Sequence, residues 1–337
     1  MKILENTSLK SYNTFGIDVK ARFLAEYNSV DELKELLQSE TARQNRLLHI
    51  GGGSNLLFLN DFEGIVLHSE IRTIETCEED AESVILRVGS GVVWDNFVEY
   101  CVDKNYYGVE NLSLIPGEVG ASAVQNIGAY GMEVKDTIEK VEFIEPESLN
   151  SRIFTNKACN YGYRNSIFKG ELKGKAIITH VYFRLKKQVC FVLDYANLKE
   201  SVERNGEINL RNIRQTVIEI REKKLPNPTL LGNAGSFFMN PVIPKNQFEM
   251  LLLNYPTMPH YPVSDTAVKV PAGWLIEQCD LKGKKFDRAG IYEKQALVIV
   301  NLGNATGHDI ATVASLVQIS VKKRFGIDII PEVNYIS

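Results

Sequence analysis

The sequence is poor in cysteine and histidine, with five of each among 337 residues. No two cysteines form a CxxC pair, and an odd, scattered set indicates reduced thiols rather than a disulfide framework. Neither HxxxH nor HExxH occurs, so we expect no metal site. The cysteines are Cys77, Cys101, Cys159, Cys190 and Cys279.

Long hydrophobic runs are missing as well. The longest clean apolar runs, such as residues 296–300, are strand-sized, whereas a bilayer requires about 20 apolar residues. At the N-terminus, Lys2 and Glu5 flank a very short apolar stretch, which is not the pattern of a signal peptide. We therefore expect a cytoplasmic protein that does not enter the membrane.

Neither sign of charge is in large excess. The formal net charge is −4 and the pI is about 5.9, so the overall field does not favour a phosphate backbone, and no nucleic-acid partner is expected. An anionic ligand would have to be held by local groups such as glycine-loop amides or single basic side chains. Hydrophobic residues at 44% and charged residues at 24% are typical of a globular protein, and the length suggests two or three domains.

Hydrophobic periodicity predicts a mixed α+β chain. Ser29 begins a capping-box pattern before a helix whose apolar face is Leu33, Leu36 and Leu37. Strand-like runs rich in β-branched residues follow. They cover residues 47–50, 56–59, 64–68 and 83–88.

A second region begins near residue 205 and contains two further helices. The first has Asn209 as its cap and ends before Pro226. The second covers about residues 310–325, with His308 or Asp309 as its cap and Gly326 at its C-terminal end. Their apolar stripes are Leu210, Ile213, Val217 and Ile220 in the first helix, and Val313, Val317 and Val321 in the second.

Two glycine-rich segments are candidates for a cofactor site. Residues 51–55 (GGGSN) follow a strand, and their amides could approach a pyrophosphate. The spacing is not GxGxxG and no capped helix follows, so this is not a Rossmann fingerprint. A tight turn whose glycines only provide positive φ is the alternative.

Residues 116–131 (PGEVGASAVQNIGAYG) have too few large apolar groups to pack a core face. Close approach to a flat, polyanionic group explains this composition. We expect Pro116 and Gly117 to open a short helix whose first amides face phosphate. A small-residue helix packed tightly on a sheet is the alternative.

A third candidate is Ser236 in residues 232–241 (GNAGSFFMNP), where a glycine turn and two phenylalanines would give a fixed, partly desolvated hydroxyl. Such a group suits a proton donor or a hydrogen-bonding role. A hydrolase nucleophile is disfavoured because the GxSxG elbow is missing and no His or acid lies nearby. A purely structural turn serine remains possible on these residues alone.

The order of these motifs resembles the UDP-N-acetylenolpyruvoylglucosamine reductases, type I branch, over about residues 7–335. The matching segments are residues 9–16 (LKSYNTFG), 51–55, 116–131, 161–169 (YGYRNSIFK), 234–241 (AGSFFMNP) and 330–333 (IPEV). This family lies in the vanillyl-alcohol oxidase superfamily. The resemblance implies an α+β fold with an FAD-binding region of the vanillyl-alcohol oxidase (PCMH) type over residues 1–204. Its two subdomains would cover about residues 1–67 and 68–204, and a C-terminal α+β substrate-binding domain would cover residues 205–337.

The resemblance also implies FAD as the cofactor and NADPH as the co-substrate. Because the loop at residues 51–54 offers neither His nor Cys, we expect the FAD to be bound noncovalently. The implied cofactor-binding residues are Gly51, Gly52, Gly53, Ser54, Asn55, Gly117, Gly120, Ala121, Gln125 and Asn126.

Three residues match the family's catalytic positions. Arg164 would stabilise developing negative charge, Ser236 would donate a proton to carbon, and Glu332 would be the catalytic carboxylate. Without the resemblance, Arg164 would pass as a surface ion-pair residue and Glu332 as a solvated tail residue. The implied reaction is reduction of the enolpyruvyl group of UDP-N-acetylenolpyruvoylglucosamine to UDP-N-acetylmuramate in peptidoglycan precursor synthesis.

The resemblance assigns the diphosphate of this substrate to Tyr195, Lys224, Asn240 and Gln295. Two positions depart from the family pattern, because Met239 replaces a lysine and Tyr292 replaces a histidine. We expect a monomer whose partners are these small molecules. The alternatives are an FAD-dependent alcohol or sugar oxidase of the same superfamily and a non-catalytic nucleotide-sugar-binding protein.

Overall fold

The computed structural model describes residues 1–337, and the chain divides into two compact units. Unit 1 contains residues 1–7, 21–52 and 63–223, and unit 2 contains residues 8–20, 53–62 and 224–337. Two short N-terminal segments therefore belong with the C-terminal third of the chain. The functional boundary between residues 204 and 205 stays a prediction.

The first sheet of unit 1 confirms the strands predicted near residues 47–50 and 64–68. Its order is β1 (Lys2–Ser8), β2 (Lys20–Tyr27), β5 (Phe62–Ser69) and β3 (Arg46–Ile50), and β3 is parallel to β5. Helix α1 (Val30–Gln38) buries its three leucines against this sheet, as predicted, and α2 (Glu40–Gln44) follows it.

The cap of α1 forms half of the predicted capping box. Ser29 Oγ accepts a hydrogen bond from the amide of Glu32 at 3.1 Å. The Glu32 carboxylate, however, accepts from the amide of Asn28 at 2.8 Å, and so it satisfies a donor one residue before the cap.

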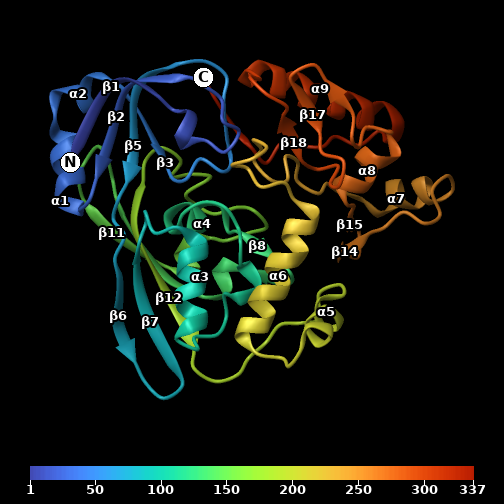
Figure 1. Ribbon diagram of the computed structural model, residues 1–337, viewed down its shortest axis with the longest axis horizontal. Helices are drawn as coiled ribbons and strands as arrows, with labels where there is room; N and C mark the ends of the chain where they lie inside the picture. The colour runs from blue at the N-terminus through green and yellow to red at the C-terminus, as the bar shows by residue number, and fades with distance from the viewer. The chain divides into compact units, whose positions relative to one another are not determined.

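The second sheet of unit 1 is antiparallel throughout. Its order is β11 (Ser151–Thr155), β10 (Ile138–Ile144), β12 (Ile177–Lys186), β7 (Ser83–Gly89) and β6 (Ile74–Glu79). Helices α3 (Trp94–Asp103) and α4 (Val119–Gln125) pack against it (Figure 1). The rings of Phe97 on α3 and Phe183 on β12 lie 4.6 Å apart at the centre of this core.

The remaining strands and α-helices of unit 1 are the short strands β8 (Gly128–Ala129) and β9 (Met132–Glu133) and the helices α5 (Leu198–Asn205) and α6 (Leu210–Lys224). The predicted cap of α6 is confirmed, because Asn209 Oδ1 accepts from the amide of Asn212 at 2.9 Å. Leu210, Ile213 and Val217 are buried, and the helix ends two residues before Pro226.

Unit 2 contains small sheets, three α-helices and the short 3-10 helix Lys10–Tyr12. The sheets are β13 (Val242–Pro244), β15 (Ala267–Lys269) and β14 (Tyr261–Ser264); β16 (Lys285–Phe286), β17 (Ala289–Ile291) and β18 (Ile299–Asn301); and the parallel pair β4 (Leu56–Phe58) and β19 (Asn334–Ile336). The helices are α7 (Lys245–Leu252), α8 (Ala272–Gln278) and α9 (Gly307–Phe325). Helices α8 and α9 pack on each other, and α9 also covers β17 and β18 (Figure 1).

The predicted cap of α9 was wrong. Thr306 caps the helix: its hydroxyl accepts from the amide of Asp309 at 3.2 Å, and the Asp309 carboxylate accepts from the amide of Thr306 at 2.8 Å. Asp309 is therefore the third residue of a reciprocal capping box rather than the cap itself. The predicted valine stripe is buried, and Gly326 ends the helix at φ +67°.

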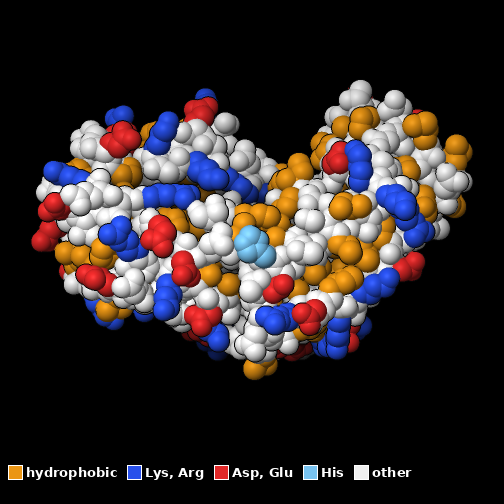
Figure 2. Space-filling model, turned by 90° about the horizontal axis from the view of Figure 1, so that it is seen from above, with side chains coloured by type: hydrophobic (Ala, Val, Ile, Leu, Met, Phe, Trp, Pro, Cys, Tyr) orange, Lys and Arg blue, Asp and Glu red, His pale blue; other side chains and the backbone are white.

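The surface carries charges of both signs. In the view of Figure 2, Lys and Arg side chains are interspersed with Asp and Glu rather than gathered into a field of one sign. No helix among the 337 residues is long and apolar enough to span a membrane.

Candidate active site

The two glycine-rich segments lie against each other in unit 1. A Cβ added at Gly52 would lie 3.3 Å from Gly117 Cα, and one added at Gly51 would lie 3.3 Å from Ala121 Cβ. Both contacts are tighter than ordinary van der Waals separations, so side chains at residues 51 and 52 would force the segments apart. The structure thus brings together four of the predicted cofactor residues, Gly51, Gly52, Gly117 and Ala121.

The start of α4 differs from the prediction. The helix begins at Val119, and its first two amides already donate to protein carbonyls, Val119 to Val92 at 2.9 Å and Gly120 to Ser90 at 3.0 Å. The expectation that the helix opens at Pro116 and Gly117 was therefore wrong, whereas contact of the segment's other amides with phosphate stays a prediction. A Cβ at Gly120 would lie 2.7 Å from Ser90 Cβ, so this glycine permits tight packing on the loop after β7. Contact of Gly120 with the cofactor stays a prediction.

The C-terminal end of α4 holds the segment that carries Arg164. Asn126 is fully buried with φ +48°, its Nδ2 donates to Gly162 O at 2.8 Å, and its Oδ1 accepts from the amide of Lys135 at 3.1 Å. Ser166 Oγ donates to Val124 O at 2.6 Å. Both side chains tie the loop around Arg164 to the end of the helix. The predicted contacts of Gln125 and Asn126 with the cofactor are untested by this geometry.

Arg164 is partly buried and has φ +53°, which is unusual for a residue other than glycine. Its Nη2 donates to Gly128 O at 2.7 Å, and its guanidinium lies 5.3 Å from the centre of the Tyr163 ring. The carbonyl of Gly128 and the face of the Tyr163 ring therefore help to orient the cation. The catalytic role of Arg164 stays a prediction.

The predicted diphosphate residue Tyr195 rests on the turn at the end of the second glycine motif. The centres of the Tyr195 and Tyr130 rings lie 6.2 Å apart in an edge-to-face arrangement. A Cβ added at Gly131 would lie 3.2 Å from Tyr195 Cβ. Asn111 Nδ2 joins the same two segments by donating to Tyr130 O at 2.8 Å and Val192 O at 2.7 Å. Sequence reasoning missed Asn111, which lies in no recognised motif.

In unit 2, Ser236 and Glu332 lie on adjacent segments. The amide of Glu332 donates a hydrogen bond to Phe237 O at 2.8 Å. Phe238 and Pro331 form an isolated antiparallel β-bridge. Phe237 is fully buried and packs edge-on against Phe15 at 6.2 Å. The two phenylalanines fill the core, and Ser236 is exposed, so the expected partial desolvation of its hydroxyl is not present.

The last part of the GGGSN loop supports Glu332 within unit 2. Gly53 has φ +62°, and a Cβ there would lie 2.0 Å from Tyr12 O, so no other residue fits. Asn55 Nδ2 donates to Glu332 O at 3.1 Å, and Asn55 O accepts from the amide of Asn334 at 3.0 Å. Cofactor contacts of Gly53, Ser54 and Asn55 remain predictions, but the support of Glu332 by Asn55 is a role the sequence did not reveal.

The other predicted substrate residues are also in unit 2. Asn240 Oδ1 accepts from the amide of Ala272 at 2.9 Å, and Gln295 Oε1 lies 3.4 Å from where a Cβ of Gly273 would be. Each of the two side chains therefore lies near the start of α8. Lys224 is exposed at the C-terminal end of α6.

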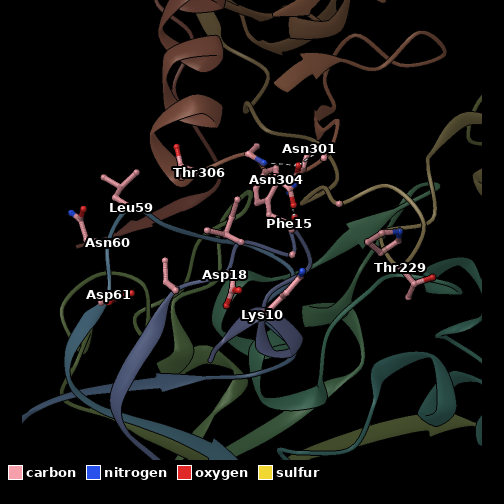
Figure 3. A pocket seen from close by; sticks show the side chains of 18 of the residues that line it. Lys10, Phe15, Asp18, Leu59, Asn60, Asp61, Thr229, Asn301, Asn304 and Thr306 are labelled. Atoms are coloured by element: carbon pink, nitrogen blue, oxygen red, sulfur yellow. Dashed lines mark hydrogen bonds between the residues drawn. The ribbon is translucent and has the colours of Figure 1, made fainter. Parts of the chain in front are cut away.

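A pocket of about 730 Å³ in unit 2 contains none of the predicted site residues. Its lining includes Lys10, Asp18, Asp61, Asn304 and Thr306 (Figure 3). Asp18 already accepts from Ser8 Oγ at 2.6 Å and Asp61 from the amide of Lys20 at 2.8 Å. Lys10, Phe15 and Gly16 of the segment 9–16 and Gly232 of the segment 232–241 also line it, but none of the predicted catalytic or ligand-binding residues does.

Comparison with known proteins decides the family. Residues 227–336 match the model of the UDP-N-acetylenolpyruvoylglucosamine reductase C-terminal domain, and residues 21–148 match an FAD binding domain. A UDP-N-acetylenolpyruvoylglucosamine reductase of Bacteroides fragilis is 52% identical over 98% of both chains. The chain belongs to the UDP-N-acetylenolpyruvoylglucosamine reductase family. The resemblance drawn from the motifs is confirmed.

Solved structures confirm the fold expected of this reductase family. The UDP-N-acetylenolpyruvylglucosamine reductase of Thermus caldophilus covers 100% of this chain and 98% of its own, with a TM-score of 0.69 at 22% identity. A 6-hydroxy-D-nicotine oxidase of Arthrobacter nicotinovorans covers 97% and 86%, with a TM-score of 0.55 at 12% identity. The fold is thus an FAD-binding region of the vanillyl-alcohol oxidase type followed by an α+β domain.

The FAD binding domain of the family fits the residues present in unit 1. The close approach of Gly52 to Gly117 leaves backbone, without side chains, where the two segments meet. Backbone amides that are not covered by side chains are the groups that bind a pyrophosphate. The residues that would hold FAD there are Gly51, Gly52, Gly117 and Ala121.

Proposed function

We propose that this chain reduces UDP-N-acetylenolpyruvoylglucosamine to UDP-N-acetylmuramate with FAD as cofactor and NADPH as reductant, a step of peptidoglycan precursor synthesis. The observation that carries the proposal is the 52% identity to a reductase of this name over 98% of both chains. As a member of the family, the chain is an oxidoreductase acting on a CH–CH group. We further propose that it works in the cytoplasm as a monomer.

Bound FAD would supply the hydride, and the protein supplies position and electrostatics. Addition of hydride to the enolpyruvyl double bond leaves negative charge on the adjoining carbon and its carboxylate. Arg164 is assigned to stabilise that charge, because its guanidinium is oriented by the carbonyl of Gly128 and the ring of Tyr163.

Ser236 is assigned to deliver the proton that completes the reduction. Its position is fixed by its neighbours, since Phe237 is buried and bonded through its main chain to Leu297 and Glu332. A hydroxyl is a weak acid and needs a proton relay. Glu332, whose main chain is joined to that of Phe237, is assigned to this relay.

The substrate diphosphate is assigned to Lys224, Asn240, Gln295 and Tyr195. Asn240 and Gln295 both lie at the start of α8, where the helix dipole favours negative charge. Lys224 would add a charge-assisted contact, and Tyr195 would contribute its hydroxyl.

An oxidase of the same superfamily is the second candidate, because an oxidase shares the fold over 97% of this chain. The match of residues 227–336 to the reductase C-terminal domain favours the reductase. That match includes Ser236, Asn240, Gln295 and Glu332.

The visible spectrum of the purified protein tests the proposal. We expect a flavin spectrum that NADPH bleaches without oxygen and that recovers when UDP-N-acetylenolpyruvoylglucosamine is added. Acid precipitation should release the flavin into the supernatant, because no His or Cys lies in residues 51–54. Recovery that is far faster with air than with the sugar nucleotide would favour the oxidase, and a colourless protein would exclude both enzymes.

A further inference from the structure

A buried histidine–carboxylate pair lies directly behind the glycine loop of unit 1. His68, near the end of β5, places its Nε2 3.0 Å from Glu118 Oε1. The side chains of His68 and Glu118 are 8% and 7% exposed. Glu118 occupies the N-cap position of α4 without capping it through its side chain. Its carboxylate faces the histidine instead of the helix.

The other oxygen of Glu118 faces the predicted cofactor loop. A Cβ at Gly51 would lie 3.2 Å from Glu118 Oε2. Glu118 also follows Gly117, whose backbone contacts Gly52. The carboxylate therefore stands beside the loop that would receive the cofactor diphosphate. Two like charges in a poorly solvated place repel each other strongly.

The remaining charged groups near His68 already have partners. Glu70 Oε1 lies 3.4 Å from His68 Nδ1. Glu26 belongs to the same cluster, because one carboxylate oxygen of Glu26, one of Glu70 and a ring nitrogen of His68 all lie within 4.8 Å of one another. Both carboxylates are partly exposed. Arg72 approaches Glu70 to 2.7 Å, and Lys2 approaches Glu26 to 3.9 Å.

Two further titratable groups on the neighbouring strands stay neutral. Burial, followed by the charge of His68, lowers the pKa of His49 to about 4. Burial raises the pKa of Tyr27 far above its usual range, and the charge of Glu118 adds to that effect. The Tyr27 hydroxyl and His49 Nε2 are bonded to each other at 2.8 Å. His68 is therefore the cation that faces Glu118 in this cluster.

We propose that protonated His68 neutralises Glu118 and so allows the loop at Gly51 and Gly52 to accept the diphosphate of FAD. His68 is a positioning residue, acting through Glu118. The inference rests on the proposed function for its cofactor, and it adds a group through which protonation controls cofactor binding.

The direction of the pH dependence follows from the surroundings of His68. Burial lowers the pKa of His68, but the hydrogen bond and charge of Glu118, together with the charges of Glu70 and Glu26, outweigh burial and raise it above its usual value. Protonated His68 therefore compensates the charge of Glu118 fully at low pH. This compensation is lost as the pH rises through the raised pKa of His68 in the folded protein. FAD should dissociate more readily at higher pH.

The test follows release of FAD from the holoprotein through the rise of flavin fluorescence on dilution, between about pH 6 and pH 9. Wild-type affinity should fall with rising pH. His68→Gln should weaken binding by about tenfold or more and remove the pH dependence, because it leaves a buried carboxylate uncompensated. Glu118→Gln should bind FAD tightly at every pH. The double variant His68→Gln/Glu118→Gln should recover most of the lost affinity. His308→Gln, at an exposed histidine in unit 2, is the matched control and should behave as wild type.

Three results would overturn the inference. The first is wild-type affinity and pH dependence in His68→Gln. The second is a double variant as weak as His68→Gln, which would show that the histidine acts through packing. The third is loss of FAD on chelation that zinc alone restores, which would assign Glu26, His68 and Glu70 to a metal. A wild-type protein that holds no FAD at any pH would instead refute the proposed function.

Discussion

Asn126 Nδ2 donates to Gly162 O at 2.8 Å and thereby joins the end of α4 to the loop that carries Arg164. The same side chain accepts from the amide of Lys135 at 3.1 Å, so both ends of the amide are used in a fully buried place. A residue predicted to bind cofactor thus also fixes a predicted catalytic segment. Its φ of +48° is one that asparagine adopts more readily than most residues.

Two substitutions of Asn126 separate the contribution of its side-chain hydrogen bonds from that of its backbone conformation. Asn126→Gly keeps the backbone conformation but removes the acceptor of the Lys135 amide and one of the two donors to Gly162 O, and should lower the free energy of unfolding by about 1–3 kcal/mol. Asn126→Ala should cost about 1 kcal/mol more because alanine is strained at positive φ. Urea unfolding followed by Trp94 fluorescence in a Trp274→Phe background reports unit 1, since the chain has two tryptophans. Equal stability of the two variants would contradict the backbone argument.

The pair of Asp95 and Arg214 joins α3 to α6. Arg214 Nη1 donates to Asp95 Oδ1 at 2.7 Å and Nη2 to Oδ2 at 3.0 Å. Burial raises the pKa of Asp95, but Arg214 and the amide of Leu114 outweigh it and hold that pKa below its usual range. The stability from this pair is present above the pKa of the unfolded state and is lost as pH falls through the lower, folded pKa.

Asp95→Asn should therefore lower the free energy of unfolding by about 1–3 kcal/mol near neutral pH. The deficit should shrink as the solution is acidified, because wild-type Asp95 then becomes protonated as well. The exposed pair of Asp103 and Arg211, at 3.3 Å, provides the control, and Asp103→Asn should change stability by less than about 0.5 kcal/mol. The same Trp94 unfolding assay at several pH values measures both variants. If the stability lost in Asp95→Asn instead grew on acidification, the pKa of Asp95 in the folded protein could not lie below its usual range.

The sequence predicted the elements whose signals are local. Helices α1 and α6 follow from leucine and isoleucine spacing and from their caps, Ser29 and Asn209, which act within three residues. The cap of α9 was misplaced at His308 or Asp309, because the reciprocal bonds that make Thr306 the cap and Asp309 its partner are seen only in three dimensions.

Long-range organisation could not be predicted in the same way. β4 pairs in parallel with β19, from near the other end of the chain, and no local pattern encodes that partner. The family resemblance supplied Ser236 and Glu332, yet the bond between the Glu332 amide and Phe237 O required the structure. Glu118 and His68 were missed because their chemistry depends on a contact between residues 50 positions apart.

The proposed diphosphate contact of Lys224 predicts a selective kinetic defect. Lys224→Ala should raise KM for the sugar nucleotide by about tenfold or more, because a charge-assisted contact is worth about 1.5–3 kcal/mol. Reduction of the flavin by NADPH should change less. Lys223→Ala, at the exposed neighbouring lysine, is the matched control and should leave KM unchanged. Equal effects of the two variants would indicate a general loss of positive charge rather than a specific contact.

The two half-reactions test Ser236 most directly. Flavin reduction by NADPH requires no proton on carbon, so Ser236→Ala should leave that step near its normal rate. Reduction of the sugar nucleotide does require the proton, and a positioned acid is worth roughly 10²–10⁴-fold, so this step should slow by at least that range.

Further variants identify the chemistry at this position. Ser236→Cys should recover part of the rate because a thiol of lower pKa can donate from a similar place, and solvent deuterium should slow the sugar-nucleotide step alone. Stopped-flow absorbance of the flavin follows both steps in one preparation, with Ser315→Ala at an exposed site on α9 as control.

The turn at Gly235 leaves the side chain of Ser236 exposed, whereas the next residue, Phe237, is buried in the core and fixes this segment. Loss of the hydroxyl should therefore not disturb the fold. Equal slowing of both steps by Ser236→Ala would mean that the serine supports the flavin or the fold, and the proton would then have to come from Glu332 or a bound water.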